Sequence, residues 1–468
     1  MLPEEFKRRL REYPGLDSEA LFDSLENQKP VKAFRINTDK LRVEDFLRLC
    51  DFDLSPVPYM KDGFYTDVES PGQIPLHAAG AMYMQDPGAM STVAAIDLKE
   101  GSKVLDVCAA PGGKTLQLSS LVGDSGIVVS NEYVTKRCRI LESNADRMGC
   151  RNVVITNLDT KFLYEVYGTY FDCVLVDAPC SGEGMFRKNE LAVDEWSIDN
   201  ILHCRDRQRE ILENVYNCVL PGGLLVYSTC TFSIEENEEN IACFLDRHPD
   251  FTLVPAKDEV VKCTSDGIDI RDKQMSLARR FYPHICPGEG QFVAILQRDK
   301  NIPIFKNNDV MARRNPKNKP DSVKNKEFVE AIKCAEAFLN ECLDTDYTAM
   351  GKSLKLYNGF VYLTDEIPFP DFGLFSPGIC VGEFRNRRIV PHHRLFSAFG
   401  NKFKNKVMLS ADSECDRENL KAYLRGSEFF IEQPMRGWAS LMYEGIPVGG
   451  IKVSGGVCKN HFPKSMWI

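Results

Sequence analysis

Two cysteines stand where covalent chemistry is possible, because each follows a run of apolar residues that predicts a buried strand. Cys180 lies in the segment DAPCSG, shortly after Asp177, and Cys230 ends the segment GLLVYSTC. A single cysteine at a strand end is usually a core residue. Two such cysteines bordered by turn residues, one of them preceded by an aspartate, favour the other interpretation. In it they act as thiolates, which are strong nucleophiles near neutral pH.

A glycine-containing turn between a strand and a helix predicts a nucleotide-type pocket. In the segment VLDVCAAPGGKT, Gly112 and Gly113 allow a ligand to approach the backbone closely, and the following helix N-terminus offers free amides. The phosphate loop of ATPases is excluded, because Cys108 occupies the position of its first glycine, and the dinucleotide fingerprint GxGxxG is absent. The turn alone does not say which nucleotide-like ligand is bound.

Two acidic residues follow the next strands of the same pattern. Glu132 ends the second strand, where a carboxylate accepts hydrogen bonds from ribose hydroxyls. Asp159 follows the third strand and is placed to receive an adenine amino group. A role as a helix cap or turn residue is the alternative for Asp159.

Together these segments resemble a known family. VCAAPGGKT, DAPCSGEG and YSTCT, with YMQDPGAM before them, are similar to the RNA (cytosine-5)-methyltransferases of the Nol1/Nop2/Sun family. The resemblance is strongest from about residue 70 to residue 298. RKNE after DAPCSGEGMF and KVSGGVCKNHFP near the C-terminus are most similar to the bacterial branch that methylates 16S ribosomal RNA. The resemblance implies S-adenosylmethionine as the methyl donor, and cytidine in ribosomal RNA or in the small ribosomal subunit as the substrate.

The resemblance also implies roles for single residues. Cys230 matches the nucleophile that bonds to the base, and Cys180 matches the cysteine that the family uses in releasing the methylated RNA. Asp177 is expected near both base and cofactor. The residues expected around the cofactor are Cys108, Ala109, Ala110, Pro111, Gly112, Gly113, Lys114, Glu132, Arg137, Asp159 and Asp177.

Rival functions lack a use for these residues. A methyltransferase acting on protein or on a small molecule has no need for two cysteines at strand ends. An RNA-binding factor without activity would show decay at Cys230, Cys180 and Asp177, which are intact. In the segment SGEGMFRKNE, Arg187 and Lys188 could close over the RNA backbone, and solvated charges on an ordinary loop are the equal alternative.

An alternation of apolar strands and helices must position these residues. From Lys103 to about Asp177 the pattern predicts a parallel sheet with crossover helices, extended by GLLVYSTC and GQFVAILQ. The predicted fold class is therefore α/β, and the resemblance implies a Rossmann-like class I methyltransferase core. The helix in SIEENEENIACFL is expected to begin at a capping box made by Ser233 and Glu236.

A chain of 468 residues exceeds what one hydrophobic core usually supports, so several domains are expected. We expect removal of residues 327–468 to weaken RNA binding and to leave cofactor binding intact. The predicted divisions are a small α+β N-terminal RNA-binding unit (1–75), the methyltransferase domain (76–298), a basic linker (299–326), a first C-terminal unit (327–395) and a small β-rich, PUA-like RNA-binding module (396–468).

Composition limits the binding mode. The net charge of −9 argues against binding nucleic acid through overall positive charge. Basic stretches at Lys300–Lys326 and Arg385–Lys406 fit RNA held at one surface, although a solvated linker and surface loop explain either stretch as well.

The remaining expectations concern metal, membrane and assembly. Seventeen scattered cysteines without a CxxC pair indicate reduced thiols, and neither cysteines nor histidines form a metal-ligand pattern. No apolar run approaches the length of a membrane-spanning helix, so we expect a cytoplasmic monomer without membrane contact.

Overall fold

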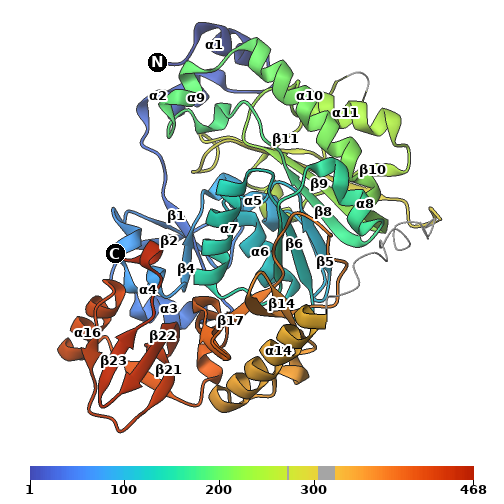
Figure 1. The fold of residues 1–468 in the computed structure, drawn as a ribbon. Coiled ribbons are helices and arrows are strands. Elements are labelled where there is room, and N and C mark those ends of the chain that lie inside the picture. The colour runs from blue at the N-terminus through green and yellow to red at the C-terminus, as the bar shows by residue number, and fades with distance from the viewer. Residues whose placement is uncertain (271–272, 304–321) are drawn as a thin grey trace.

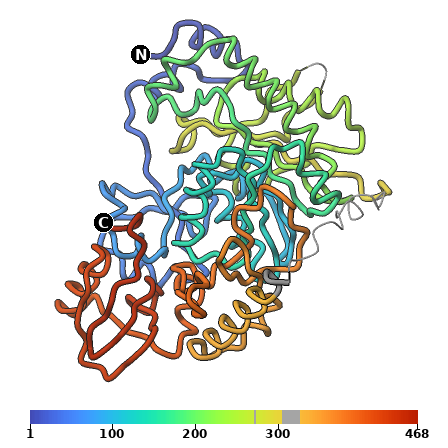
Figure 2. The backbone as a smooth tube through the Cα atoms, in the orientation of Figure 1, coloured from blue at the N-terminus to red at the C-terminus, as the bar shows by residue number. Residues whose placement is uncertain are grey.

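The structure is a computed structural model that describes residues 1–270, 273–303 and 322–468. In these residues four β-sheets carry the architecture, and the largest has ten strands. Figure 1 shows this sheet at the centre of the molecule, with the N-terminal helices above it and the C-terminal modules below, and Figure 2 traces the same path.

Five neighbouring strands at the middle of the large sheet are parallel, in the spatial order β9-β8-β5-β6-β7. The chain runs outward from β5 to β7 and then crosses to β8 and β9, so the direction of winding switches between β5 and β8. Ligands bind at such a switch point, beyond the carboxyl ends of the strands. The arrangement confirms the predicted parallel sheet. The strands are β5 (Lys103–Asp106), β6 (Ile127–Asn131), β7 (Val153–Thr156), β8 (Phe171–Asp177) and β9 (Val219–Thr229).

Antiparallel strands complete the sheet beside β9. β13 (Gln291–Arg298) pairs with β9 along most of its length. The other strands on this side are β10 (Phe251–Val254), β11 (Ser265–Asp266) and β12 (Arg279–Phe281), and the short helix α12 (Asp258–Val261) lies between β10 and β11.

Helices cover both faces of the sheet. Successive residues of a strand point to opposite sides, so apolar side chains on both sides need a covering layer on each face. Val104 belongs to the core that contains Leu141, and its neighbour Leu105 to the core that contains Leu212. Each strand is therefore apolar throughout, as a doubly covered parallel sheet requires. One face carries α5 (Pro87–Ala94), α6 (Gly113–Val122) and α7 (Thr135–Met148), and the other carries α8 (Leu163–Tyr167), α10 (Ile198–Val215) and α11 (Glu238–Arg247).

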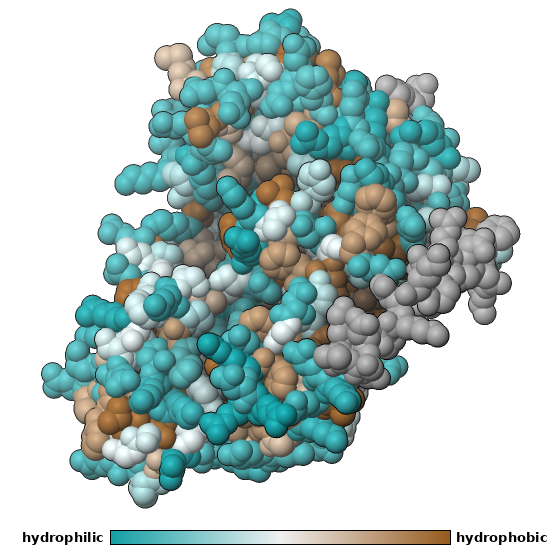
Figure 3. Space-filling view, viewed as in Figure 1, coloured by the Kyte–Doolittle hydropathy of each residue, from teal (hydrophilic) through white to brown (hydrophobic). Residues whose placement is uncertain are grey.

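The N-terminal unit is divided between two places. Its helices α1 (Glu4–Arg11) and α2 (Ser18–Asn27) share a core with Phe186 and Phe232, which lie in the segments after Cys180 and Cys230. Its sheet instead shares a core with the C-terminal module. Figure 3 shows a hollow between these two parts of the molecule, with apolar side chains on its floor.

The N-terminal sheet has the order β2-β3-β1-β4. It continues to Met84, past the boundary expected at residue 75, because β4 pairs with β1. Its elements are β1 (Ala33–Ile36), α3 (Val43–Leu49), β2 (Leu54–Pro56), β3 (Gly63–Thr66), α4 (Pro75–Ala78) and β4 (Met82–Met84).

Two small sheets form the C-terminal part. The boundary expected at residue 395 falls inside α15 (His393–Phe399), which lies between them. The first sheet follows α14 (Ser322–Cys342) and contains β14 (Ser353–Tyr357), β15 (Phe360–Thr364), β17 (Ile379–Arg385) and β18 (Arg388–Pro391). The second has the order β19-β21-β22-β23-β20 and contains β19 (Lys406–Leu409), α16 (Glu414–Leu424), β20 (Phe429–Phe430), β21 (Gly437–Tyr443), β22 (Ile446–Ser454) and β23 (Val457–Asn460).

The C-terminal part is joined to the central sheet by backbone and side-chain contacts. β16 (Leu374–Ser376) pairs antiparallel with β7 and adds a strand to the edge of that sheet. Arg394 of α15 is fully buried and donates hydrogen bonds to the backbone oxygens of Cys150 and Val153. The methyltransferase core and the C-terminal part thus form a continuous structure.

The predicted capping box before α11 is wrong. The helix begins at Glu238, and Asn237 at the capping position makes no side-chain hydrogen bond to it. Ser233 donates to Glu235, while the Glu236 carboxylate accepts a hydrogen bond from the backbone nitrogen of Ser181. The Glu236 carboxylate therefore binds Ser181, which is distant in sequence, in place of the local backbone that a capping box would provide.

Within the described residues, none of the helices has both the length and the apolar surface needed to cross a bilayer.

Candidate active site and cofactor pocket

Parallel pairing of β8 with β9 brings the two predicted cysteines together. Asp177 and Ser228 are opposite each other at the ends of these strands, so the chain leaves both strands at the same edge of the sheet. The Sγ atoms of Cys180 and Cys230 lie 3.3 Å apart. Two thiols at this separation can share one hydrogen, and both can reach one small group placed between the loops.

The environment holds a proton on Cys180. The hydrogen bond with Cys230 and burial together raise the pKa of the Cys180 thiol well above its usual range. At neutral pH Cys180 is therefore a neutral thiol that can donate a hydrogen bond to the sulfur of Cys230.

Asp177 links the cysteines to the glycine turn. Its Oδ2 forms an ion pair with Lys114 Nζ, at the start of α6, at a distance of 2.8 Å. Its Oδ1 accepts a hydrogen bond from the Ser228 hydroxyl, and Gln291 Nε2 lies 3.1 Å from that hydroxyl. Asp177 is thus fixed between the predicted cofactor turn and the strand that leads to Cys230.

A cavity of about 210 Å³ opens against the glycine turn. Gly112 has a φ of +116°, a conformation that side chains rarely adopt, and a Cβ atom there would lie 2.9 Å from Leu141. The turn can therefore be made only with glycine at this position. The cavity is lined by Tyr83, Met84, Gln85, Asp86, Ala89, Asp106, Cys108, Ala109, Ala110, Pro111, Gly113, Lys114 and Asp177.

Glu132 is buried at the end of β6 and keeps one carboxylate oxygen without a hydrogen bond. Oε1 accepts from the backbone nitrogen of Val134 at 2.8 Å, whereas Oε2 has only Arg137 Nη1 at 3.3 Å, too poorly aligned for a hydrogen bond. Arg137 also donates to the backbone oxygen of Ala110 in the turn, at 2.6 Å. A buried acceptor without a partner beside such a turn fits a ligand that brings hydroxyl donors.

Asp159 has the capping role that the sequence left open. Its side chain accepts from the backbone nitrogen of Lys161 at the start of a 3-10 turn and forms an ion pair with Lys161 Nζ at 2.9 Å. The hydrogen bond from Lys161 lowers the pKa of Asp159. The carboxyl group is partly exposed and lies outside the residues that line the cavity.

The interpretation as a cation on an open loop is wrong for Arg187, whereas Lys188 is exposed and ion-paired. Arg187 is almost completely buried and forms an ion pair with Glu289 at 2.9 Å. Lys188 forms an ion pair with Asp86 at 2.7 Å. The Arg187 charge is neutralised inside the protein and the Lys188 charge at its surface, and the two ion pairs hold the segment after Cys180 against Glu289 and Asp86.

The sequence analysis missed further residues of the site. Glu183 and Glu236 are buried beside the cysteine loops, and burial raises the pKa of Glu236 to about 7. Gln291, from β13, reaches Asp177 of β8 across the intervening strand β9. Glu183 lies within the motif DAPCSGEG and Glu236 within the expected capping box, but the local sequence does not show what they contact, because their partners lie far away along the chain.

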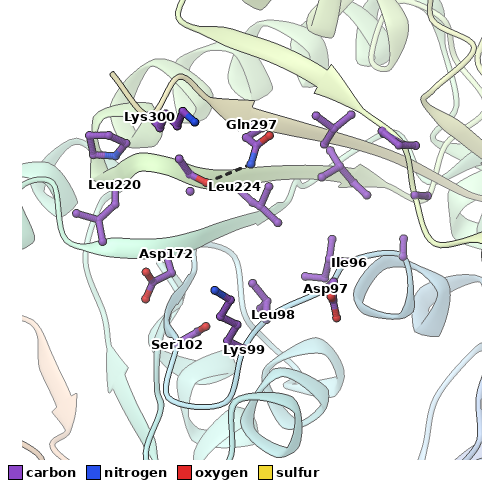
Figure 4. A pocket seen from close by; sticks show the side chains of 18 of the residues that line it. Ile96, Asp97, Leu98, Lys99, Ser102, Asp172, Leu220, Leu224, Gln297 and Lys300 are labelled. Atoms are coloured by element: carbon purple, nitrogen blue, oxygen red, sulfur yellow. Dashed lines mark hydrogen bonds between the residues drawn. The ribbon is translucent and has the colours of Figure 1, made fainter. Parts of the chain in front are cut away.

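A larger cavity, of about 900 Å³, lies at the opposite edge of the sheet. Figure 4 shows a mixed lining, with apolar side chains such as Ile96 and Leu224 beside charged ones such as Asp172 and Lys300. Asp172 is already an acceptor for the backbone nitrogen of Lys103. Because the cavity adjoins the amino ends of β5 and β8 and contains none of the predicted residues, its size does not make it the active site.

Three parts of the chain match described families. Residues 2–87 match the N-terminal domain of 16S rRNA methyltransferase RsmF, residues 93–297 match 16S rRNA methyltransferase RsmB/F, and residues 411–467 match the methyltransferase RsmF PUA domain. The chain is also 30% identical over 460 residues to the ribosomal RNA small subunit methyltransferase F of Vibrio vulnificus, covering 94% of this chain and 92% of that protein. It is 28% identical over 481 residues to the protein of the same name from Klebsiella pneumoniae, covering 99% and 96%.

Solved structures share the core. A methyltransferase homolog protein from Pyrococcus horikoshii has a TM-score of 0.55 and 30% identity, covering 63% of this chain and 95% of that one. NSun6 from Pyrococcus horikoshii with SFG has the same TM-score and 22% identity, covering 63% and 98%, a likeness of fold.

Proposed function

This chain belongs to the ribosomal RNA small subunit methyltransferase F family, and from that premise we propose that it methylates carbon 5 of cytidine in 16S ribosomal RNA, with Cys230 as a covalent nucleophile. The observation that carries the chemical part is the pair of thiols 3.3 Å apart, beside Asp177 and the cofactor turn. Two thiols in contact at the ligand edge of the sheet suit a cycle in which one sulfur bonds to the base and the other assists its departure.

S-adenosylmethionine is the methyl donor, and when bound it supplies a methyl group carried on a positively charged sulfur. Its binding residues are proposed to be the turn Cys108–Lys114, with Glu132, Arg137, Asp159 and Asp177. The Oε2 of Glu132, which has no hydrogen bond, suits a ribose hydroxyl, and Gly113 of the turn lines the cavity. For Asp159, whose carboxyl group already caps a turn, contact with adenine would use the exposed side of the group.

Addition to the base is the first step. Carbon 5 of cytosine is a poor nucleophile until a group adds at carbon 6. The Cys230 thiolate forms a bond to carbon 6, and the ring electrons move toward nitrogen 3, where a proton placed with the help of Asp177 neutralises them. Carbon 5 then carries the electron pair that takes the methyl group.

Release reverses the addition. A base removes the proton from carbon 5, the double bond between carbons 5 and 6 re-forms, Cys230 leaves as a thiolate, and nitrogen 3 gives up the proton that it gained during addition. Cys180 assists because its thiol, which holds its proton at neutral pH, donates a hydrogen bond to the departing sulfur 3.3 Å away. Without that hydrogen bond the covalent adduct should persist.

RNA recognition is assigned to the N-terminal unit and the PUA-like module. A cytidine must leave its stack to reach Cys230, so contacts to the surrounding RNA have to compensate for unstacking. Most of the basic stretch Lys300–Lys326 lies outside the described residues. In the stretch Arg385–Lys406, Arg394 is buried against Cys150 and Val153, whereas Arg385, Arg388 and Lys402 are exposed. A monomer acting in the cytoplasm is the simplest form of this proposal.

A denaturing gel of cysteine variants tests the proposal. With 5-fluorocytidine RNA and the methyl donor, the native protein should form a slowly migrating protein–RNA species, and Cys230→Ala should form none and transfer no methyl group. Cys180→Ala should accumulate the species on ordinary RNA. The reverse pattern would exchange the two roles, and full activity in both variants without any adduct would refute covalent catalysis. Bisulfite sequencing of ribosomal RNA from a strain without the protein identifies the cytidine.

A further inference from the structure

Two buried carboxylates join the cysteine loops crosswise. Ser181 follows Cys180 and Thr231 follows Cys230, and their hydroxyl oxygens lie 2.9 Å apart. Glu236, from the segment after Cys230, accepts from the backbone nitrogen of Ser181 at 3.0 Å. Glu183, from the segment after Cys180, accepts from the backbone nitrogen of Phe232 at 3.0 Å. Each loop therefore supplies the acid that holds the other.

Counting hydrogens shows that one of these acids is protonated. Three oxygen–oxygen contacts follow one another, from Glu236 Oε1 to Ser181 Oγ, then to Thr231 Oγ1, then to Glu183 Oε2. Each contact needs one hydrogen, and the two hydroxyls supply two. The third must come from a carboxyl group, because a contact between two oxygens without a hydrogen would be repulsive.

The surroundings identify Glu236 as the protonated acid. Its Oε1 contacts only the Ser181 hydroxyl, while Oε2 accepts both backbone N–H of Ser181 and Nε2 of Gln208. Both oxygens of Glu183 instead meet N–H donors, from Trp196 at 2.8 Å and from Phe232 at 3.0 Å. Burial raises the pKa of both acids, that of Glu236 to about 7, so the hydrogen-bond partners and not the direction of the pKa shift make the assignment.

We propose that neutral Glu236 donates a hydrogen through Ser181 and Thr231 to the carboxylate of Glu183, and that this chain is the positioning device that keeps Cys180 against Cys230. The inference rests on the proposed function, because it concerns the alignment of two cysteines in one covalent cycle. The titratable groups that face Glu236 are Glu183, Cys180, Cys204 of α10 and Tyr227 of β9. Of these groups, the carboxylate of Glu183 disfavours a negative charge on Glu236.

The proposal predicts opposite results when each of the two glutamates is replaced by glutamine. In Glu236→Gln the amide N–H can donate to Ser181 Oγ and the amide oxygen can accept from Ser181 and Gln208, so the neutral acid is reproduced. In Glu183→Gln the amide nitrogen would face the N–H of Trp196 or Phe232, and one acceptor is lost. A role in general packing would not distinguish these two substitutions, since both change one oxygen into an NH₂ group.

The first measurement is the protein–RNA species on ordinary RNA. Glu183→Gln and Glu236→Ala should accumulate it about tenfold over the native protein, the order expected for loss of a hydrogen bond to a charged or buried group. Glu236→Gln should stay within about twofold of the native protein, as should the control Glu235→Gln, whose carboxylate pairs with Arg9 instead. In a Cys180→Ala background neither glutamate substitution should add to the effect, because the chain acts through Cys180.

The second measurement needs no RNA. Diamide, an azo oxidant, should take two electrons and two protons from the thiols of Cys180 and Cys230 and join them in a disulfide, which peptide mapping detects. Misalignment in Glu183→Gln should slow this reaction about tenfold, the scale of one lost hydrogen bond, and Glu236→Gln should leave it unchanged. Equal effects of the two substitutions in either measurement would overturn the proposal. Normal disulfide behaviour without any RNA adduct in the native protein would overturn the proposed function and leave the positioning chain standing.

Discussion

The protonated state of Glu236 predicts how the stability of the protein changes with pH. Burial raises the pKa of this carboxyl group from an ordinary value of 4.5 to about 7. Between these pH values the folded protein retains a proton that the unfolded chain has released, so the free energy of unfolding falls as the pH rises. The contribution is complete below pH 4.5 and is lost once the pH passes 7.

The size of this stability change follows from the interval between the two pKa values of Glu236. One pH unit corresponds to about 1.4 kcal/mol for each proton retained, so the interval amounts to roughly 3 kcal/mol, as an order of magnitude. A domain of 150 to 250 residues changes its melting temperature by roughly 2 to 4 °C per kcal/mol. Between pH 5 and pH 8 the melting temperature of the native protein should therefore fall by on the order of 5 °C more than that of a variant in which Glu236 cannot ionise.

Glu236→Gln is that variant, and thermal unfolding at pH 5 and pH 8 is the assay. All other titrating groups are common to both proteins, so the difference between their melting temperatures isolates Glu236. Glu235→Gln is the matched control, because the hydrogen bond from Arg9 lowers the pKa of Glu235 and its titration falls below this range. Melting temperatures of the native protein and Glu236→Gln that change in parallel with pH would refute the reasoning.

Three further predictions follow from the described contacts. Glu132→Ala should weaken S-adenosylmethionine binding about tenfold or more in isothermal titration, the loss of a charge-assisted hydrogen-bond pair, and unchanged affinity would remove Glu132 from the site. Arg280→Met should lower the free energy of unfolding by about 3 to 5 kcal/mol in denaturant titration, because it leaves the fully buried carboxylate of Glu238 without its ion pair. As a control, loss of the exposed ion pair between Arg8 and Glu5 should have no measurable effect. RNA affinity should fall steeply with salt, and Arg385→Glu with Arg388→Glu should weaken it further and flatten the salt dependence, with cofactor binding as the unaffected control.

The central sheet was predictable because its physical cause is local. A parallel strand covered on both faces has to be apolar at every position, and segments such as KVLDV around Val104 and Leu105 show this without reference to the rest of the chain. Ligand residues of such a sheet follow the strand ends, so Cys180, Cys230 and Glu132 could be located once the strands were placed. The family resemblance added the chemistry, and membership of the family is confirmed.

Residues whose partners are distant in sequence were misassigned. Ser233 and Glu236 have the spacing of a capping box, but Ser181 and Gln208 compete for the same carboxylate, and burial beside them decides the outcome. Arg187 was similarly placed on a loop, either closing over the RNA backbone or solvated, although its partner Glu289 lies 102 residues away. Local patterns predict the hydrogen-bonding capacity of such groups and leave the choice of partner to the tertiary fold.

The predicted modules are joined by tertiary contacts, and these contacts change how RNA docking should be tested. Removing residues 327–468 would remove β16 from the edge of the central sheet, together with the oxygen of Gly373, which accepts from Asn157 N at 2.6 Å. It would also remove Arg394, which satisfies the buried oxygens of Cys150 and Val153. Because β7 and Asn157 lead directly to Asp159 in the proposed cofactor site, the truncated protein should lose cofactor affinity as well as RNA affinity, contrary to the expectation from sequence. Charge reversal at exposed arginines leaves these contacts in place, so it separates RNA docking from the integrity of the sheet where truncation cannot.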